Sequence, residues 1–267
     1  MPSDQIALTR HDALAVITLD RLEARNALSP EMLAELGRAL NSCRSPQVRA
    51  VLLTGSGGAF CAGADVKDLV QHLEQGGPEA LSAHLRALAG ALHRDVILPL
   101  RQLAKPVVAG VNGVAAGAGF SLMLACDYRV ASESARFLMA YAGIGGTPDG
   151  GATYLLPRLV GSARAMEVYL AAQPLSAQRA LELGLVSQVC PAEGFDHHVL
   201  EIATCLAQGP TAAYGRAKAL FEASGEASLE AQLDAEAAAI SNMALTRDFQ
   251  EGIRAFAQKR RPWFQGR

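Results

Sequence analysis

Residues 111–121 read Val111-Asn112-Gly113-Val114-Ala115-Ala116-Gly117-Ala118-Gly119-Phe120-Ser121. They follow an apolar run, 107–111, that predicts a buried strand, and they lead into another, 121–126, that predicts a buried helix. In such a strand–turn–helix unit, unpaired backbone N–H groups and the helix dipole favour bound negative charge. The alternative is that the glycines bind no ligand and only allow two stretches of backbone to pack closely. The glycine spacing matches neither the dinucleotide fingerprint G-x-G-x-x-G nor a Walker loop.

A second glycine-rich segment, 54–66, has the same setting, because it follows the apolar run 50–53. Two strand-to-loop turns of this kind can direct two backbone N–H groups at one oxygen. An oxyanion hole requires such a pair, and each donor lowers the reaction barrier by roughly 3 kcal/mol. The two segments together therefore favour a site that stabilises negative charge on a carbonyl oxygen.

These two segments resemble the enoyl-CoA hydratase/isomerase, or crotonase, family. The matching stretches are Phe60-Cys61-Ala62-Gly63-Ala64-Asp65 and the run from Asn112 to Gly119. Further matching motifs, which follow in the family's order and extend the resemblance over essentially the whole chain, lie at 23–28, 148–151, 156–161, 175–186 and 251–256. Within the family, the chain is most similar to the PaaG-like isomerases of the phenylacetate pathway.

The resemblance implies an α/β fold, a crotonase-like spiral of ββα turns followed by a C-terminal helical region that packs trimers. It assigns residues 1–195 to the spiral core and residues 196–267 to helical oligomerisation. It also implies an acyl-CoA substrate, a homotrimer or a dimer of trimers, and no cofactor apart from the coenzyme A of the substrate.

The same resemblance assigns roles to individual residues. The backbone N–H groups of Ala64 and Ala118 correspond to the oxyanion donors. The two glutamates with which hydratases deliver water are replaced by Ser121 and Tyr141, so Asp149 is left as a single acid/base that moves a proton between two carbons. The expected contacts to CoA and the acyl group are Glu23, Ala24, Arg25, Ala62, Asp65, Val66, Lys67, Gly117, Ser121, Tyr141 and, from a neighbouring subunit, Lys259.

Several alternatives stay open at this level. Asp149 can instead cap the helix expected near Gly151. His84 and His93 lie in 66–104, the segment expected to shape the acyl pocket, and either is a candidate second acid or base. A hydratase with a non-standard water site and a non-catalytic acyl-CoA binder are the competing functions. Cys61 is expected to be a small buried thiol.

Composition excludes other classes of function. The 267 residues carry a formal net charge of −2, which gives no electrostatic basis for binding nucleic acid or a membrane surface. No apolar run is long enough to span a bilayer, and the first residues do not resemble a secretory signal. The five cysteines are scattered and His197-His198 lacks ligand spacing, so we expect no metal site and a cytoplasmic, reducing setting.

The hydrophobic pattern predicts the elements between these motifs. Strands are expected at 6–8, 14–19, 50–54, 107–111, 128–131, 136–139 and 185–189. Helices are expected at 31–43, 66–104 with an interruption at 75–78, 121–126, 153–159, 163–171 and from 195 onward. Ser29 and Pro30 are expected to be the N-cap and first residue of the first of these helices.

Overall fold

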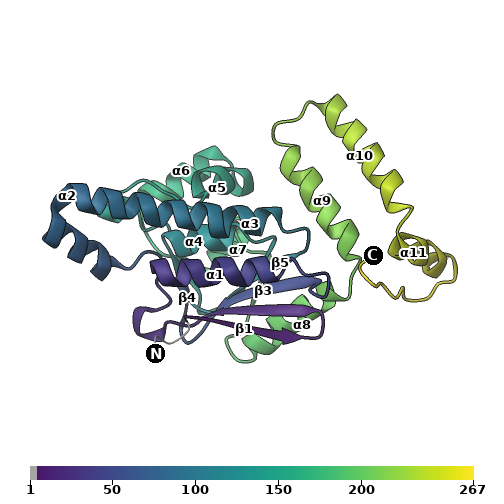
Figure 1. Ribbon diagram of the computed structural model, residues 1–267, viewed down its shortest axis with the longest axis horizontal. Helices are drawn as coiled ribbons and strands as arrows, with labels where there is room; N and C mark the ends of the chain where they lie inside the picture. The colour runs from purple at the N-terminus through teal and green to yellow at the C-terminus, as the bar shows by residue number, and fades with distance from the viewer. Residues whose placement is uncertain (1–4) are drawn as a thin grey trace.

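Two β-sheets form the centre of the protein, in a computed structural model that describes residues 5–267 (Figure 1). The six-stranded sheet has the order β1 (Ile6–His11), β2 (Leu14–Leu19), β3 (Ala50–Gly55), β5 (Val107–Val111), β7 (Tyr128–Ser132), β10 (Gln188–Cys190). The four-stranded sheet has the order β4 (Ala59–Cys61), β6 (Val114–Ala116), β8 (Arg136–Leu138), β9 (Leu175–Ser176).

The helices connect and cover these strands. They are α1 (Pro30–Ser42), α2 (Val66–Ala91), α3 (Leu98–Gln102), α4 (Ala118–Leu124), α5 (Ala152–Val160), α6 (Ser162–Ala171), α7 (Ala177–Glu182), α8 (Phe195–Ala207), α9 (Thr211–Ala223), α10 (Leu229–Met243) and α11 (Arg247–Ala257). Shorter segments are the 3-10 turns η1 (Leu22–Ala24) and η3 (Ala142–Ile144) and the π-helical η2 (Leu92–Ile97). Among the described residues, every helix is too short or too polar to cross a membrane.

Successive strands alternate between the two sheets. β3, β5 and β7 pair in parallel in the larger sheet, whereas β4, β6 and β8, the strands that follow each of them, pair in parallel in the smaller one. The helices α2, α4 and α5 come after these three strand pairs. The chain therefore advances by repeated strand–strand–helix turns, which confirms the predicted ββα spiral.

Local sequence signals account for α1. The Ser29 hydroxyl accepts a hydrogen bond from the Met32 N–H group over 3.1 Å, and Pro30 occupies the first helical position. Met32, Leu33 and Leu36 on one face of this helix are buried in the core. Helical spacing of apolar residues and a side-chain cap thus place α1 as the sequence predicts.

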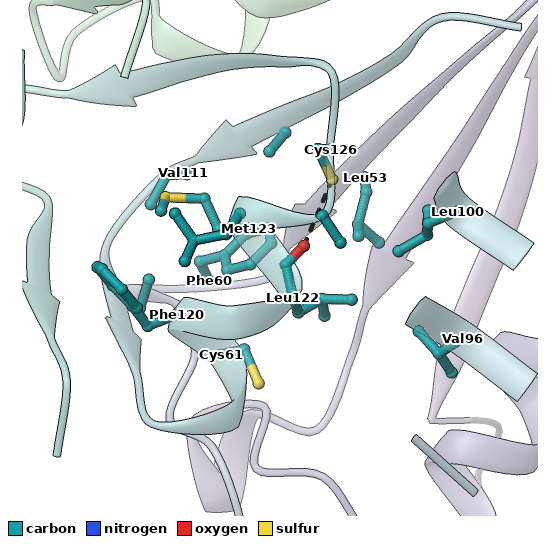
Figure 2. Packing of buried hydrophobic residues seen from close by; sticks show 14 of the residues in the cluster. Leu53, Phe60, Cys61, Val96, Leu100, Val111, Phe120, Leu122, Met123 and Cys126 are labelled. Atoms are coloured by element: carbon teal, nitrogen blue, oxygen red, sulfur yellow. Dashed lines mark hydrogen bonds between the residues drawn. The ribbon is translucent and has the colours of Figure 1, made fainter. Parts of the chain in front are cut away.

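The core is centred on α4, whose residues are all buried. Phe120, Leu122 and Met123 on this helix pack among side chains from neighbouring strands, including Phe60 of β4 (Figure 2). The helix begins at Ala118, three residues before the predicted start at 121. The reason is Gly117, whose φ of +50° turns the chain directly from β6 into the helix.

The helices at the C-terminal end divide into two groups. α8 lies against the six-stranded sheet, where Phe195 and Val199 pack in a cluster with Leu14 and Leu52. α9, α10 and α11 extend away from both sheets (Figure 1). The predicted helical character of this region is confirmed, and its part in oligomerisation stays a prediction.

Candidate active site

The turns that follow β4 and β6 lie side by side because these two strands pair in parallel. Ala59 is opposite Val114, and Cys61 is opposite Ala115. Gly63 allows the turns to approach closely, since a Cβ atom at this position would lie 2.7 Å from the Ala116 carbonyl oxygen. The spiral therefore brings together the two glycine-rich segments, although residues 67–110 of the sequence separate them.

Each of these turns carries one of the predicted oxyanion donors. Ala118 is the first residue of α4, and Ala64 lies two residues before α2. The site that a Cβ atom on Gly63 would occupy is 3.2 Å from the Ala118 nitrogen. Within residues 5–267, neither the Ala64 nor the Ala118 N–H group has a hydrogen-bond acceptor. An oxyanion hole needs two such unpaired donors on adjacent turns; their assignment to this role stays a prediction.

Cys61 of β4 lies directly beneath the first turn of α4. A Cβ atom on Gly119 would lie 2.2 Å from the Cys61 carbonyl oxygen, so α4 packs directly on the backbone of β4. The Cys61 side chain is fully buried, and this burial raises the pKa of its thiol to about 12. Cys61 is therefore a protonated core residue, as the sequence predicts, and not a nucleophile.

Three predicted site residues, one on α4 and two in the loop between β8 and α5, converge before the start of α5. The Tyr141 hydroxyl donates to the Asp149 carboxylate oxygen Oδ1 over 2.5 Å. The Ser121 hydroxyl, on α4, donates to the Asp149 backbone carbonyl over 2.8 Å and lies 3.1 Å from the Tyr141 hydroxyl oxygen. Because Ser121 is three residues after Ala118, these bonds attach the Asp149 turn to the helix that begins with Ala118.

The state of Tyr141 follows from its surroundings. Burial, and then the charge of the neighbouring Asp149 carboxylate, raise the pKa of the Tyr141 hydroxyl above its usual value. Tyr141 therefore stays protonated at neutral pH and acts as a donor. Asp149 Oδ2 has no hydrogen-bond donor among the described residues, so this oxygen keeps its lone pairs available.

The alternative that Asp149 merely caps a helix is wrong. α5 begins at Ala152, and its N-cap position is occupied by Gly151 without a side-chain cap. The Ala152 N–H group donates to the Asp149 backbone carbonyl, over 3.1 Å, and not to its carboxylate. Gly150 and Gly151 have φ angles of +59° and +79°, a left-handed turn that separates Asp149 from the first residue of the helix.

The two candidate histidines lie at different places. His93, in η2, accepts a hydrogen bond at Nε2 from the Gly150 N–H group over 3.0 Å, so in the neutral ring the proton is on Nδ1. It supports the turn that carries Asp149, a role that no spacing in the sequence indicates. His84 lies on α2 against Asp68, with Nε2 2.6 Å from Oδ2.

Most of the remaining predicted contacts surround the Ala64 turn. Arg25 has a φ of +51°, and its carbonyl accepts the Ala62 N–H group over 3.1 Å. Asp65 caps α2 through the Lys67 N–H group and forms an ion pair with Arg21 over 2.8 Å. Burial opposes ionisation of Asp65, but the bonds from Arg21 and from the helix N–H groups outweigh it and lower the pKa of the carboxyl.

The other side chains of the predicted set are less constrained. Glu23, Arg25, Val66 and Lys67 are exposed, and Ala24 is half-buried in η1. Lys259 follows α11, at the opposite end of the molecule from α2 (Figure 1). One chain thus does not bring Lys259 to the Ala64 turn, and its predicted contribution from a neighbouring subunit stays a prediction.

Comparison with solved structures defines the class of protein. An enoyl-CoA hydratase from Bacillus anthracis superposes with a TM-score of 0.90 at 33% identity, covering 98% of this chain and all of the other. An enoyl-CoA hydratase from Polaromonas gives a TM-score of 0.89 at 36% identity, with 97% and 99% covered. The fold is therefore that of the crotonases.

Sequence relatives agree with this class. The family model described as enoyl-CoA hydratase/isomerase matches residues 9–267. A Rhodobacter capsulatus protein named probable enoyl-CoA hydratase is 42% identical over 96% of both chains. The 1,2-epoxyphenylacetyl-CoA isomerase of Escherichia coli is 38% identical over 94% of both. The chain belongs to the enoyl-CoA hydratase/isomerase family, and the family implies an enzyme with an acyl-CoA substrate.

Proposed function

We propose that the protein is an enoyl-CoA isomerase that shifts a C=C double bond with Asp149 as its single acid/base. The observation that carries this proposal is the placement of the Asp149 carboxylate. Its Oδ1 is held by the Tyr141 hydroxyl, while Oδ2 is free of protein donors among the described residues. A carboxylate with one oxygen fixed and one oxygen free is suited to take up and return a proton.

The proposed reaction uses both parts of the site. The thioester carbonyl oxygen accepts hydrogen bonds from the Ala64 and Ala118 N–H groups, which stabilise the enolate that forms when a proton leaves C2 of a 3-enoyl-CoA. Asp149 takes this proton, the electrons of the C–H bond move into the dienolate, and the same carboxyl returns the proton to C4. The product is a 2-enoyl-CoA, and no water is consumed.

Hydration is the competing reaction, and the hydratase names of several relatives make it the one to exclude. It requires activation of a water molecule as well as protonation of carbon. Tyr141 is a poor base because the pKa of its hydroxyl is raised by burial and by Asp149. The Ser121 hydroxyl is already bonded to the Asp149 backbone.

The name of the Escherichia coli relative makes a phenylacetate-derived acyl-CoA the first substrate class to examine.

The test is to incubate the protein with a 3-enoyl-CoA or a 2-enoyl-CoA in deuterated water and to follow products by mass. We expect deuterium uptake with double-bond migration and no addition of water. Asp149→Asn should lower kcat by about 10³-fold while leaving acyl-CoA affinity unchanged. A hydrated product from the parent protein, formed equally by Asp149→Asn, would contradict the proposal.

Tyr141→Phe tests the support of the carboxylate separately. Loss of this hydrogen bond to a charged group should lower kcat by about tenfold. Tyr169→Phe is the matched control, since the Tyr169 hydroxyl bonds the Gly146 carbonyl in the same loop over 3.1 Å and does not contact Asp149 in the structure. Equal effects of the two substitutions would show that the loop, and not the carboxylate, is being perturbed.

The CoA contacts and the oligomeric state belong to the same proposal. Arg25 and Lys67 are exposed beside the Ala64 turn, so they are available to CoA phosphates. The C-terminal helices and tail expose large apolar side chains, among them Phe221, Phe256 and Trp263. Such surface is typical of subunit contacts and supports self-association, and the homotrimer or dimer of trimers is what the family resemblance implies.

A further inference from the structure

The helix α2 consists of two arms joined at a sharp bend. Gly77 has a φ of +72° and a ψ of −171°, which no helix contains, and Pro78 starts the second arm. The arms 66–76 and 78–91 fold back on one another at the edge of the molecule (Figure 1). No residue of α2 is buried, so packing in the core contributes little to holding the arms together.

Three side chains meet between the arms. Asp68 and His72 lie one turn apart on the first arm, and His84 comes from the second. His84 Nε2 lies 2.6 Å from Asp68 Oδ2. His72 Nδ1 lies 2.9 Å from the Asp68 backbone carbonyl oxygen and 3.3 Å from Asp68 Oδ1. The two imidazole rings stack with centroids 3.7 Å apart and planes inclined by 14°. One carboxylate thus faces two imidazoles.

We propose that Asp68, His72 and His84 form a binding site for a transition-metal dication, with Zn²⁺ as the expected ion. One ligand atom from each residue lies within 4.8 Å of the others. Zn²⁺ binds imidazole nitrogen and carboxylate oxygen at about 2.0–2.2 Å, so rotation of the side chains can bring all three atoms to one ion. Water would complete a tetrahedral shell.

The chemistry of the three ligands selects the class of ion. Imidazole nitrogen suits Zn²⁺, Cu²⁺, Ni²⁺ and Co²⁺, whereas Ca²⁺ and Mg²⁺ need several oxygen ligands that this cluster does not offer. Partial burial suits a bound ion as well, because the His84 side chain is only 13% exposed. A dication would also neutralise the Asp68 carboxylate beside the stacked rings.

The consequence of binding is mechanical. The ligands come from both arms, so the ion fastens the bend at Gly77 closed. The first arm begins at Val66, directly after the Asp65 cap and two residues after Ala64. Metal would therefore restrict one wall of the candidate active site without taking part in the reaction. The sequence contains the D-x-x-x-H spacing of Asp68 and His72, but His84 joins it only across the bend.

Binding is measured on the full-length, metal-free protein by titrating Zn²⁺ against a chromogenic chelator. Cys205, an exposed thiol, is replaced by Ser in every variant so that it does not bind the ion. We expect one Zn²⁺ per chain. His84→Gln and, separately, His72→Gln should weaken binding by at least about tenfold.

His197→Gln is the matched control. This exposed histidine also has a carboxylate, Glu201, one helical turn away, at 3.7 Å, but has no second arm opposite it. It should leave Zn²⁺ affinity unchanged. Hydrogen exchange gives a second readout, since Zn²⁺ should slow exchange in 66–91 of the parent and not of His84→Gln. Absence of stoichiometric binding, or equal binding by His84→Gln with the parent's protection, would overturn the proposal.

Discussion

α2 and α4 occupy equivalent places in successive turns of the spiral, yet they are held in opposite ways. Each follows the second strand of a strand pair, and each begins beside one of the two unpaired N–H groups. Every residue of α4 is buried, whereas none of α2 is. The Ala118 side of the site is thus part of the core, and the Ala64 side continues into a surface arm.

This difference indicates how one site can combine a fixed and an adjustable wall. Because α4 is buried, the positions of Ala118 and Ser121 are fixed. The same packing leaves no room for a change in the distance between α4 and the strand beneath it. α2 depends on local devices, namely the Asp65 cap, the bend at Gly77 and the cluster between its arms. Elements with few buried contacts open at low free energy, so we expect motion near the acyl group to be concentrated in α2.

The largest effect is expected where α4 meets β4. Gly119→Ala would place a Cβ atom 2.2 Å from the Cys61 carbonyl oxygen, so the helix must move off the strand. We expect a loss of stability on the order of 4 kcal/mol, measured by urea denaturation. Gly143→Ala is the control, because a Cβ atom there meets nothing within 4 Å. If the two variants were equally stable, α4 would not be fixed by this contact.

A smaller contrast is expected between leucines of the two helices. Leu122 on α4 is fully buried, and Leu73 on α2 is 45% exposed. Leu122→Ala should lower the free energy of unfolding by about 3 kcal/mol, because it leaves a cavity in the core. Leu73→Ala should lower it by less than about 1 kcal/mol. Similar losses would mean that α2 is packed as firmly as α4.

The smallest effect concerns the start of α2. Asp65→Ala removes a helix cap and the partner of Arg21, and should cost about 1 kcal/mol at pH 7. Because folding lowers the pKa of Asp65, its contribution is complete above the ordinary carboxyl pKa of about 4 and is lost as pH falls through the folded value.

Denaturation of the parent and Asp65→Ala at pH 7 and pH 3 measures this contribution. The difference between them should shrink at the lower pH. Asp20→Ala, at an exposed carboxylate without an ion pair among the described residues, is the control. A difference that stayed constant with pH would assign the effect to the helix backbone and not to the Asp65 charge.

Local sequence predicted the parts of the fold that local forces decide. Continuous apolar runs predicted the strands β3 and β5, and Ser29 followed by Pro30 predicted the start of α1. β4 and β6, of three residues each, were placed within loops, because such short strands exist only through their pairing with one another. β10 begins at Gln188, three residues after its predicted start, since pairing with β7 fixes its register.

The candidate site divides in the same way. Motif resemblance named Ser121, Tyr141 and Asp149, and the structure brings these three together. The place of His93 depends on η2, a π-helical segment inside a predicted continuous helix, and no local pattern indicated that its Nε2 meets Gly150. The contacts of His84 with Asp68 and His72 likewise depend on the bend at Gly77, and the sequence does not indicate the direction of this bend.

The alternation of strands between the sheets has an evolutionary consequence. Ala64, Ala118 and Asp149 lie after β4, β6 and β8, in three consecutive turns of one spiral. Under the proposed roles, acid/base side chains on the second and third turns, at Ser121, Tyr141 and Asp149, can change while Ala64 and Ala118 keep the same pair of amide groups. Under the proposed mechanism, a new reaction on a thioester substrate then requires only side-chain substitutions, and the backbone of the spiral is left intact.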